Sequence, residues 1–291
     1  MNIWYNVNMK YKLENDKILI SEKNDFNATH ILECGQIFRY KKLDDISYLI
    51  FSGDKTAKIV ETQNGYDIIT KDVQYFENFF DLKNDYSIIK NTLCNQNETL
   101  KKATSFGNGI RILNQPPFEM IISFIISANN NIKRIQGLVE KLSVKCGKKM
   151  GDFYAFPTIE ELSTLSIDDL KNMGMGFRAK YIFETTKKLQ GFNLENLRNY
   201  ETEKLLEFLS TLSGVGPKVA DCIALFAYHK MDCFPVDTWV EKIYNSYFSK
   251  EKETNRVKIR KNLVNNFGNL SGYAQQYLFY YKRELDKNHI Q

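Results

Sequence analysis

Residues 212–222 read Leu212-Ser213-Gly214-Val215-Gly216-Pro217-Lys218-Val219-Ala220-Asp221-Cys222 and place a Gly-x-Gly turn between two apolar segments. Gly214 and Gly216 carry no side chain, so backbone N–H groups there can approach an anion closely. Pro217 suits the first position of the next helix, whose N-terminus carries free donors and partial positive charge. The pattern predicts a helix-hairpin-helix over residues 203–229, which contacts a DNA backbone without reading its sequence. An ordinary tight turn between packed helices is the alternative.

Lys218 lies in the first turn of the second predicted helix, where acidic residues are favoured and a lysine breaks the local rule. We expect the helix dipole and partial burial to lower the pKa of this lysine. An amine that is neutral part of the time is a nucleophile for Schiff-base chemistry. The alternative is an exposed lysine that contacts phosphate.

Asp237 lies 19 residues downstream, within Phe234-Pro235-Val236-Asp237-Thr238-Trp239, and is placed as the N-cap of another helix. As a cap alone it contributes about 1 kcal/mol. As an ionised carboxylate facing Lys218, it can also stabilise an oxocarbenium ion at a sugar C1′. A lysine and an aspartate beside a DNA-binding hairpin predict a DNA glycosylase with lyase activity.

Length and composition limit the possible classes of protein. The 291 residues correspond to about two domains. Hydrophobic residues make up 43% and charged residues 26%, a composition typical of globular proteins that excludes extensive disorder. No run of ~18 apolar residues predicts a transmembrane helix, and the first residues lack the pattern of a signal peptide.

The cysteines and charges indicate the compartment and the partner. The five cysteines form no C-x-x-C pair and the three histidines are scattered, so we expect no metal site. An odd number of cysteines favours a reducing, cytoplasmic location, at the nucleoid if the cell is prokaryotic. The net charge of +5 falls entirely within residues 116–291, which is compatible with a polyanionic partner.

The chain divides at Pro116-Pro117. Before it, a hairpin signal at Asn64-Gly65 lies among short β-prone runs: Lys17–Ser21, Gln36–Tyr40, Tyr48–Ser52, Ala57–Glu61 and Tyr66–Thr70. After it, the apolar spacing is helical. We therefore predict an α+β protein, with an N-terminal antiparallel β-sheet domain at 1–115 and an all-helical, two-lobed region at 116–291.

Several helices of the second region are predicted by apolar spacing or by capping residues. Thr158-x-x-Glu161 and Ser166-x-x-Asp169 resemble capping boxes. The other predicted helices are Phe118–Ala128, a helix from Ile132 that ends at Gly147, Leu205–Leu212, Lys218–His229, Asp237–Phe248, Lys252–Asn266 and Gly272–Asp286.

The hairpin and the Pro-Val-Asp segment together resemble the helix-hairpin-helix, Gly/Pro-Asp DNA glycosylase superfamily. Four more segments resemble its 8-oxoguanine DNA glycosylase branch, in collinear order from Gly35 to Phe279. They are Gly35-Gln36-Ile37-Phe38-Arg39-Tyr40, Ser127-Ala128-Asn129-Asn130-Asn131-Ile132-Lys133-Arg134, Gly174-Met175-Gly176-Phe177-Arg178-Ala179-Lys180-Tyr181 and Ser271-Gly272-Tyr273-Ala274-Gln275-Gln276-Tyr277-Leu278-Phe279.

The resemblance implies that duplex DNA lies across a cleft, that Lys218 attacks C1′ and that Asp237 assists. It places four residues around the flipped base: Gly35, whose carbonyl senses the lesion, Cys222, Gln275 and Phe279. It places further residues on the DNA: Asn129 in the vacated stack, Arg134 and Arg178 at the orphaned cytosine, Phe177 as a wedge, and Gly214, Gly216 and Trp239 near the backbone.

The sequence departs from the family at two of these positions. Trp239 stands where animal-type members carry histidine, and an aromatic ring can still pack on the sugar. Phe177 replaces the commoner tyrosine. The four-cysteine cluster of the endonuclease III and adenine-glycosylase branches is missing from the sequence.

The predicted function is a bifunctional enzyme that excises 8-oxoguanine, preferably opposite cytosine, and then nicks the abasic site. Two alternatives remain: a monofunctional alkylbase glycosylase of the same fold, which needs no lysine, and a non-catalytic DNA-binding protein. We expect a monomer without membrane contact and without a required cofactor. Whether the hairpin backbone binds a cation is left open.

Overall fold

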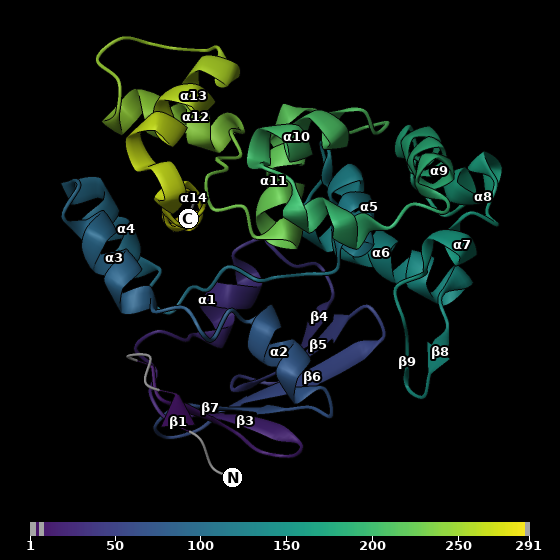
Figure 1. Ribbon diagram of the computed structural model, residues 1–291, viewed down its shortest axis with the longest axis horizontal. Coiled ribbons are helices and arrows are strands. Elements are labelled where there is room, and N and C mark those ends of the chain that lie inside the picture. The colour runs from purple at the N-terminus through teal and green to yellow at the C-terminus, as the bar shows by residue number, and fades with distance from the viewer. Residues whose placement is uncertain (1–3, 6–8, 289–291) are drawn as a thin grey trace.

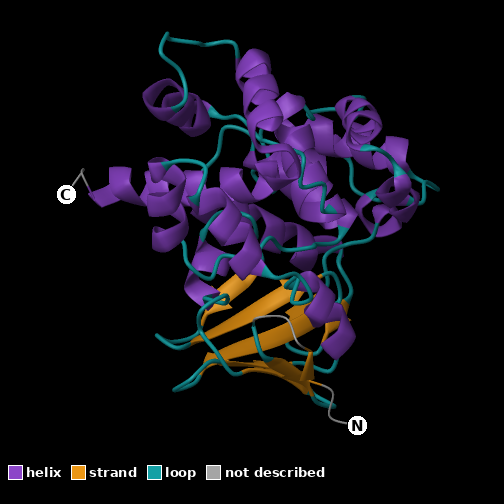
Figure 2. Ribbon diagram, turned by 60° about the vertical axis from the view of Figure 1, so that its left-hand side comes forward, coloured by secondary structure: helices purple, strands orange, loops and turns teal. Residues whose placement is uncertain are grey.

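Seven short strands form one antiparallel sheet at one end of the molecule, and most helices lie above it (Figures 1 and 2). The computed structural model describes residues 4–5 and 9–288. The strand order is β1-β2-β3-β7-β6-β5-β4. The strands are β1 (Trp4–Tyr5), β2 (Tyr11–Leu13), β3 (Lys17–Ile20), β4 (Tyr40–Lys42), β5 (Ser47–Ser52), β6 (Lys55–Glu61) and β7 (Tyr66–Ile69). The predicted sheet is confirmed.

Alternating side chains give the sheet its buried face. In β3, Ile18 and Ile20 are buried, and in β7 Ile68 is buried whereas its neighbour Ile69 is exposed. The buried side chains pack against α1 (Ala28–Glu33) and α2 (Val73–Phe79) in one apolar cluster. Because successive side chains of a strand point to opposite faces, this pattern fixes which face of the sheet the helices cover.

The predicted strand Gln36–Tyr40 is wrong over most of its length, since β4 begins only at Tyr40. The side chain of Gln36 is fully buried and bonds to distant backbone instead of packing on a sheet. Its Nε2 donates to the carbonyl of Arg111 at 2.8 Å, and its Oε1 accepts from the N–H of Leu113 at 2.9 Å. These bonds hold residues 34–39 as a connection between α1 and the sheet.

The predicted hairpin at Asn64-Gly65 joins β6 and β7, and Thr62 N–H donates to the Gly65 carbonyl at 2.9 Å. The expected reason for it is wrong, because neither residue of the pair has a positive φ. Glycine is required by close approach: a Cβ on Gly65 would lie 1.8 Å from the carbonyl oxygen of Ile20.

The helical part contains all the predicted helices, and both capping boxes, at Thr158 and at Ser166, are confirmed. The last predicted helix but one begins at Arg256, not at Lys252, because Asn255 caps it. The helices that follow α2 are α3 (Tyr86–Cys94), α4 (Glu98–Phe106), α5 (Pro117–Ser127), α6 (Ile132–Cys146), α7 (Ile159–Leu162), α8 (Ile167–Asn172), α9 (Arg178–Leu189), α10 (Thr202–Ser210), α11 (Pro217–Tyr228), α12 (Thr238–Tyr247), α13 (Arg256–Phe267) and α14 (Ser271–Asn288). Helices α1 to α4 and α9 were not anticipated. A small hairpin, β8 (Lys149–Met150) and β9 (Phe153–Tyr154), follows α6.

Helices α3 and α4 precede Pro116 in the chain but pack with the helical part. Helix α4 packs against α14, and α3 packs against α4 (Figure 1). Their residues Leu93 and Leu100 belong to the large apolar cluster that also contains α5, α11 and α14. A domain division at residue 115 stays a prediction.

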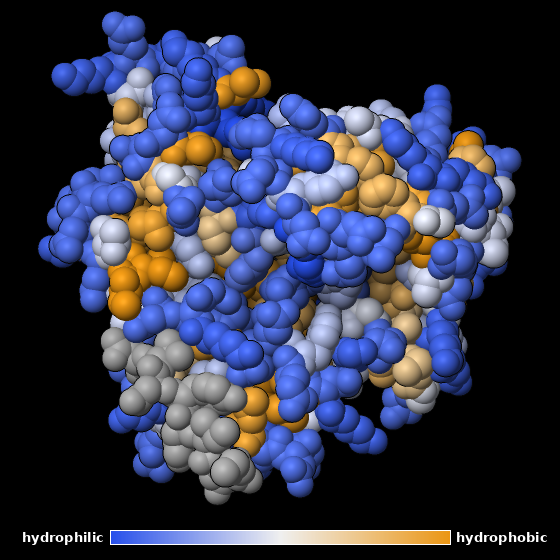
Figure 3. Space-filling view, viewed as in Figure 1, coloured by the Kyte–Doolittle hydropathy of each residue, from blue (hydrophilic) through white to orange (hydrophobic). Residues whose placement is uncertain are grey.

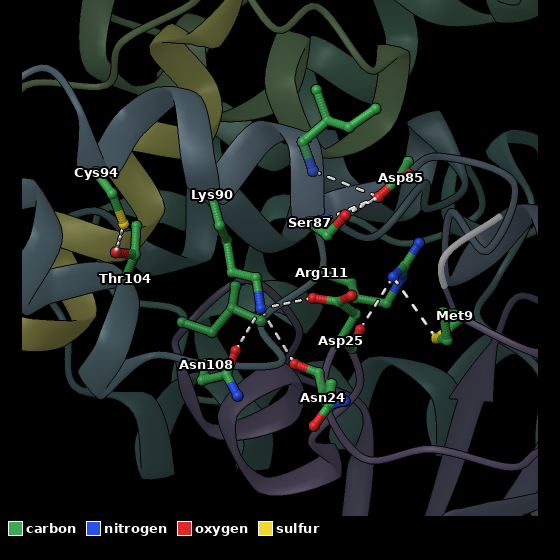
Figure 4. Close-up of polar contacts among 12 residues, drawn as sticks. Met9, Asn24, Asp25, Asp85, Ser87, Lys90, Cys94, Thr104, Asn108 and Arg111 are labelled. Atoms are coloured by element: carbon green, nitrogen blue, oxygen red, sulfur yellow. Dashed lines mark hydrogen bonds and ion pairs between the residues drawn. The ribbon is translucent and has the colours of Figure 1, made fainter.

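Polar contacts join the segment before α1 to α3 and to the chain around Arg111 (Figure 4). The ammonium of Lys90 on α3 lies 2.6 Å from the carboxylate of Asp25 and donates to Asn108 Oδ1 at 2.5 Å. Arg111 is fully buried and its Nη1 donates to the Asp25 carbonyl at 3.0 Å. Because buried donors left without partners are costly, these bonds favour one position of the segment.

The visible face is largely hydrophilic, with small separate hydrophobic areas (Figure 3). Within the described residues, no helix has both the length and the apolar character needed to cross a bilayer.

We expect Gly65→Ala to lower the free energy of unfolding by about 2 kcal/mol or more, because the new methyl group would overlap the Ile20 carbonyl and force the hairpin to shift. Gly137→Ala is the matched control. Gly137 lies within α6 with no atom within 4 Å of its Cβ position, so alanine should stabilise by up to about 1 kcal/mol. Urea unfolding measures both values. Equal stability of the two variants would contradict the close approach at Gly65.

Candidate active site

The hairpin between α10 and α11 gives its two glycines different roles. Gly214 has a φ of +81°, and a Cβ there would lie 2.8 Å from the side chain of Tyr181. Gly216 caps α11 in extended backbone, and no atom lies within 4 Å of its Cβ position. Gly214 therefore serves the turn and its packing, whereas Gly216 leaves the N-terminus of α11 open to an anion such as phosphate.

One cleft of 660 Å³ collects residues from distant parts of the chain. Lys218 enters it from the first turn of α11, and Asp237 from the N-cap of α12. Gly35 comes from the connection after α1, and Phe279 from α14. The remaining lining residues are Phe38, Phe124, Ser127, Asn130, Asn131, Ile132, Lys133, Ile135, Trp239, Arg283 and Asp286. The predicted catalytic pair thus faces the same space as two of the predicted base-pocket residues.

The pKa of Lys218 is raised, so the expectation of a lowered value is wrong for the protein without DNA. The thiolate form of Cys222 favours the ammonium most, and the Asp237 carboxylate adds to it, against burial, which favours the neutral amine. Burial raises the pKa of Cys222 to about 11, so both groups titrate in the alkaline range. At neutral pH Lys218 is therefore an ammonium, which must lose a proton before it can act as a nucleophile.

Asp237 caps α12 as predicted, whereas its second predicted role, at the reacting sugar, stays a prediction. Its Oδ1 accepts from the N–H groups of Trp239 at 2.9 Å and Val240 at 3.0 Å, which caps α12. These bonds leave Oδ2 for a group in the cleft. The half-buried Trp239 lines the same cleft, and the ammonium of Lys242 lies 4.9 Å from its ring centroid.

The turn at Gly35 is held by amide groups that the sequence analysis did not single out. Gly35 has a φ of +88°. The carbonyl before it, on Cys34, accepts from Gln276 Nε2 at 3.0 Å. The carbonyl after it, on Gln36, accepts from Gln115 Nε2 at 2.8 Å. Both glutamines are buried, so they fix the orientation of the peptide units around Gly35. Gln276 could have been suspected only from its place beside Gln275.

The Phe279 ring adjoins this turn, because a Cβ on Gly35 would lie 3.5 Å from it. Gln275, one turn earlier on α14, is buried, and its Oε1 has no hydrogen-bond partner among the described residues. Gln275 and Cys222 are not among the residues that line the cleft, although Cys222 is coupled to Lys218. Their predicted places around the base stay predictions.

A second group of predicted residues lies together at the junction of α5, α6 and α9. Asn129 has a φ of +51°, and its carbonyl accepts from Arg178 Nη2 at 2.9 Å. Burial lowers the pKa of Arg178, with a smaller effect from Arg134. Phe177 is 56% exposed, and Arg134 is exposed with only a long contact of 3.4 Å to the Gly174 carbonyl. Arg134 and Phe177 are therefore free to meet a ligand, whereas Arg178 is already bound to backbone.

No group of three or more His, Cys, Asp or Glu side chains that could hold a metal ion occurs within the part of the chain that the structure describes.

Two protein families match the chain in succession. The family described as 8-oxoguanine DNA glycosylase, N-terminal domain, matches residues 17–121. The HhH-GPD superfamily of base excision DNA repair proteins matches residues 122–268.

Relatives named N-glycosylase/DNA lyase match most of the chain. The N-glycosylase/DNA lyase of Saccharomyces cerevisiae is 30% identical over 93% of this chain and 86% of its own length. The N-glycosylase/DNA lyase OGG1 of Arabidopsis thaliana is 37% identical over 66% of this chain, and the match spans 58% of that protein. The 8-oxoguanine glycosylase/lyase of Clostridium acetobutylicum, solved with double-stranded DNA containing cytosine opposite 8-oxoguanine, is 38% identical with a TM-score of 0.88. That match covers 95% of this chain and 98% of the other.

The raised pKa of Lys218 predicts that the rate of imine formation depends on pH. The fraction of neutral amine should increase about tenfold per pH unit below that pKa, so imine formation with abasic-site DNA should accelerate from pH 6 to pH 9. Cyanoborohydride trapping under single-turnover conditions measures the rate. A wild-type rate that is constant above pH 7 would show that the pKa is lowered instead.

Proposed function

The chain belongs to the 8-oxoguanine DNA glycosylase family, and we propose that it excises 8-oxoguanine from duplex DNA and then cleaves the abasic site. The observation that carries this proposal is the shared cleft of Lys218, Asp237, Gly35 and Phe279 next to the open N-terminus of α11. A monofunctional glycosylase would have no use for a lysine at that place. A non-catalytic DNA-binding protein would need neither the lysine nor the carboxylate.

Base release requires that the nucleotide leave the stack and enter the cleft, which costs a few kcal/mol. The Lys218 amine then forms a bond to C1′ as the bond from C1′ to the base breaks. The positive charge that develops at C1′ and O4′ faces the Asp237 carboxylate. The proton that the ammonium gives up can pass to the departing base, which needs one.

Strand cleavage follows from the same covalent bond. Opening of the sugar ring converts the adduct at Lys218 into an imine between C1′ and the lysine nitrogen. Loss of a proton from C2′ then breaks the bond from C3′ to its oxygen, so the 3′ phosphate leaves with the electron pair. Water hydrolyses the imine and restores the amine. These steps use only side chains of the protein, so we propose that no cofactor is required.

Discrimination from guanine rests on the Gly35 carbonyl in this proposal. Guanine has a bare N7, which is an acceptor, whereas 8-oxoguanine carries a proton there. A carbonyl directed at N7 attracts the lesion and repels the normal base, and a mispaired buried group costs about 1–3 kcal/mol. The buried amides of Gln115 and Gln276 support this role, because they restrict how the Gly35 carbonyl can turn.

Two further expectations are proposals of the same kind. Arg134, which is exposed, and Arg178, which already donates to backbone carbonyls, favour cytosine opposite the lesion. Guanidinium groups only donate, and unpaired cytosine offers two acceptors.

Five free cysteines, three of them buried, fit a reducing, cytoplasmic location beside DNA.

Lys218→Gln should retain DNA binding but lose both base excision and strand nicking, because glutamine cannot form an imine. Borohydride trapping with an 8-oxoguanine duplex measures the covalent adduct. Lys101→Gln is the control, because it removes an exposed lysine of α4 outside the cleft and should leave the yield unchanged. An adduct formed by Lys218→Gln at the wild-type yield would refute the assignment.

Asp237→Asn should slow base excision by about 10²-fold or more, the usual scale for losing one preorganised electrostatic partner. Asparagine retains an Oδ1 that can accept from Trp239 and Val240, so the cap of α12 and the melting temperature should be preserved. Single-turnover rates and thermal unfolding test the two statements. A loss within about threefold in a folded variant would reduce Asp237 to a capping residue.

Arg134→Ala should lower the ratio of the excision rate opposite cytosine to the excision rate opposite adenine. The expected decrease corresponds to about 1–3 kcal/mol for one lost contact. Lys141→Ala is the matched control, because Lys141 also reaches the loop before α9, donating to the Met173 carbonyl at 3.4 Å. Its ratio should match the wild type. Equal wild-type rates opposite both bases would show that no such preference exists.

A further inference from the structure

Arg283 on α14 lines the cleft of Lys218 and Asp237 and is only 9% exposed. Its guanidinium is anchored on one side. Nε and Nη2 donate to Glu284 Oε1 at 2.9 and 2.8 Å, and Nη2 also donates to the carbonyl of Glu33 at 2.5 Å. These bonds tie α14 to the end of α1 and fix the plane of the guanidinium.

The other side of the same guanidinium is unpaired. Nη1 is buried and has no hydrogen-bond partner among the residues that the structure describes. A buried donor without an acceptor is costly, and such groups in a folded protein call for a physical explanation. The need to anchor α14 explains the hydrogen bonds of Nε and Nη2. It does not explain why Nη1 is buried without a partner among the described residues.

The unpaired nitrogen lies where a flipped base is expected. A Cβ on Gly35 would lie 3.3 Å from Nη1 and 3.5 Å from the Phe279 ring. The guanidinium carbon is 5.7 Å from the centroid of that ring. A purine that stacks on Phe279 with its N7 edge toward the Gly35 carbonyl would therefore bring the neighbouring atoms of that edge toward Nη1.

The chemistry of that edge suits a donor. In 8-oxoguanine the N7–H is flanked by two carbonyl oxygens, O6 and O8, and both are acceptors. The carbonyl of Gly35 can serve only the N7–H, because an oxygen cannot donate to either neighbour. Nη1 can donate to the oxygen beside it, and a charged donor makes a stronger hydrogen bond than a neutral one.

We propose that Arg283 is a base-binding residue that donates a hydrogen bond from Nη1 to a carbonyl oxygen flanking N7 of the flipped base. This inference rests on the proposed excision of 8-oxoguanine. The Gly35 carbonyl then accepts from the N7–H of the lesion, and Arg283 donates to the oxygen next to that N7–H. If the oxygen is O8, which guanine lacks, Arg283 adds to discrimination; if it is O6, it adds to binding alone.

The test compares Arg283→Leu with wild type on DNA that carries a base and on DNA that carries none. Excision of 8-oxoguanine opposite cytosine under single-turnover conditions should fall about 10- to 100-fold, the range for one charged hydrogen bond. Nicking of preformed abasic-site DNA involves no base and should change by less than about twofold. Lys101→Leu, which removes an exposed cation of α4 outside the cleft, is the control for loss of charge.

A second arm identifies the oxygen. 8-Oxoadenine retains O8 and the N7–H but carries an amino group in place of O6. An equal loss on 8-oxoguanine and 8-oxoadenine assigns the bond to O8, and a loss on 8-oxoguanine alone assigns it to O6. Arg283→Lys retains a charged donor and should fall between wild type and leucine, which provides a variant if leucine does not fold.

Two results would overturn the proposal. Excision by Arg283→Leu at the wild-type rate would show that Nη1 makes no contact with the base. An equal fall in excision and in abasic-site nicking would show that Arg283 only holds α14 in place. Failure of the proposed function itself is distinguishable, because the wild type would then neither excise the lesion nor nick the abasic site.

Discussion

The buried carboxamide of Gln36 places one wall of the cleft relative to the others. It bonds to the backbone of Arg111 and Leu113, in the segment that leads into α5, and so fixes the turn at Gly35 against the helical part. Gln276 holds the same turn from α14, the helix that also carries Phe279. Loss of a partner for any of these buried amides costs about 1–3 kcal/mol, so the turn has one favoured position. The proposed sensing of a single proton on the base by the Gly35 carbonyl requires such rigidity.

The charges of the cleft suit the proposed reaction, in which positive charge moves from the Lys218 ammonium to the sugar. Lys218 enters as an ammonium stabilised by Asp237 and coupled to Cys222. Once the amine has attacked, the same carboxylate faces the charge at the sugar, so its role continues from the free protein into the reaction. Both bonds that cap α12 are accepted by Oδ1, so they hold Asp237 in place and leave Oδ2 able to face the cleft. In the proposed mechanism, the side chain of Asp237 therefore both stabilises α12 and takes part in catalysis.

The sequence alone predicted the positions of those site residues that are set by their neighbours in the chain. The hairpin places Lys218 in the first turn of α11, and the Pro-Val-Asp segment makes Asp237 an N-cap, so both positions follow from nearby residues. The lowered pKa expected for Lys218 failed because the effect of Cys222, one turn later on α11, was left out, and because the Asp237 carboxylate reaches Lys218 from another helix. The strand expected at 36–40 failed because Gln36 bonds to backbone more than 70 residues away. Arg283 was missed because an unpaired donor can be recognised only after its partners are known.

The central claim is that the Lys218 nitrogen forms the covalent bond to C1′ of the damaged nucleotide. Its most direct test is peptide mapping by mass spectrometry of the wild-type protein after borohydride reduction on 8-oxoguanine DNA. The predicted result is a single modified peptide, with the sugar remnant on Lys218. A remnant on another lysine or on the N-terminal amine, with Lys218 unmodified, would contradict the claim.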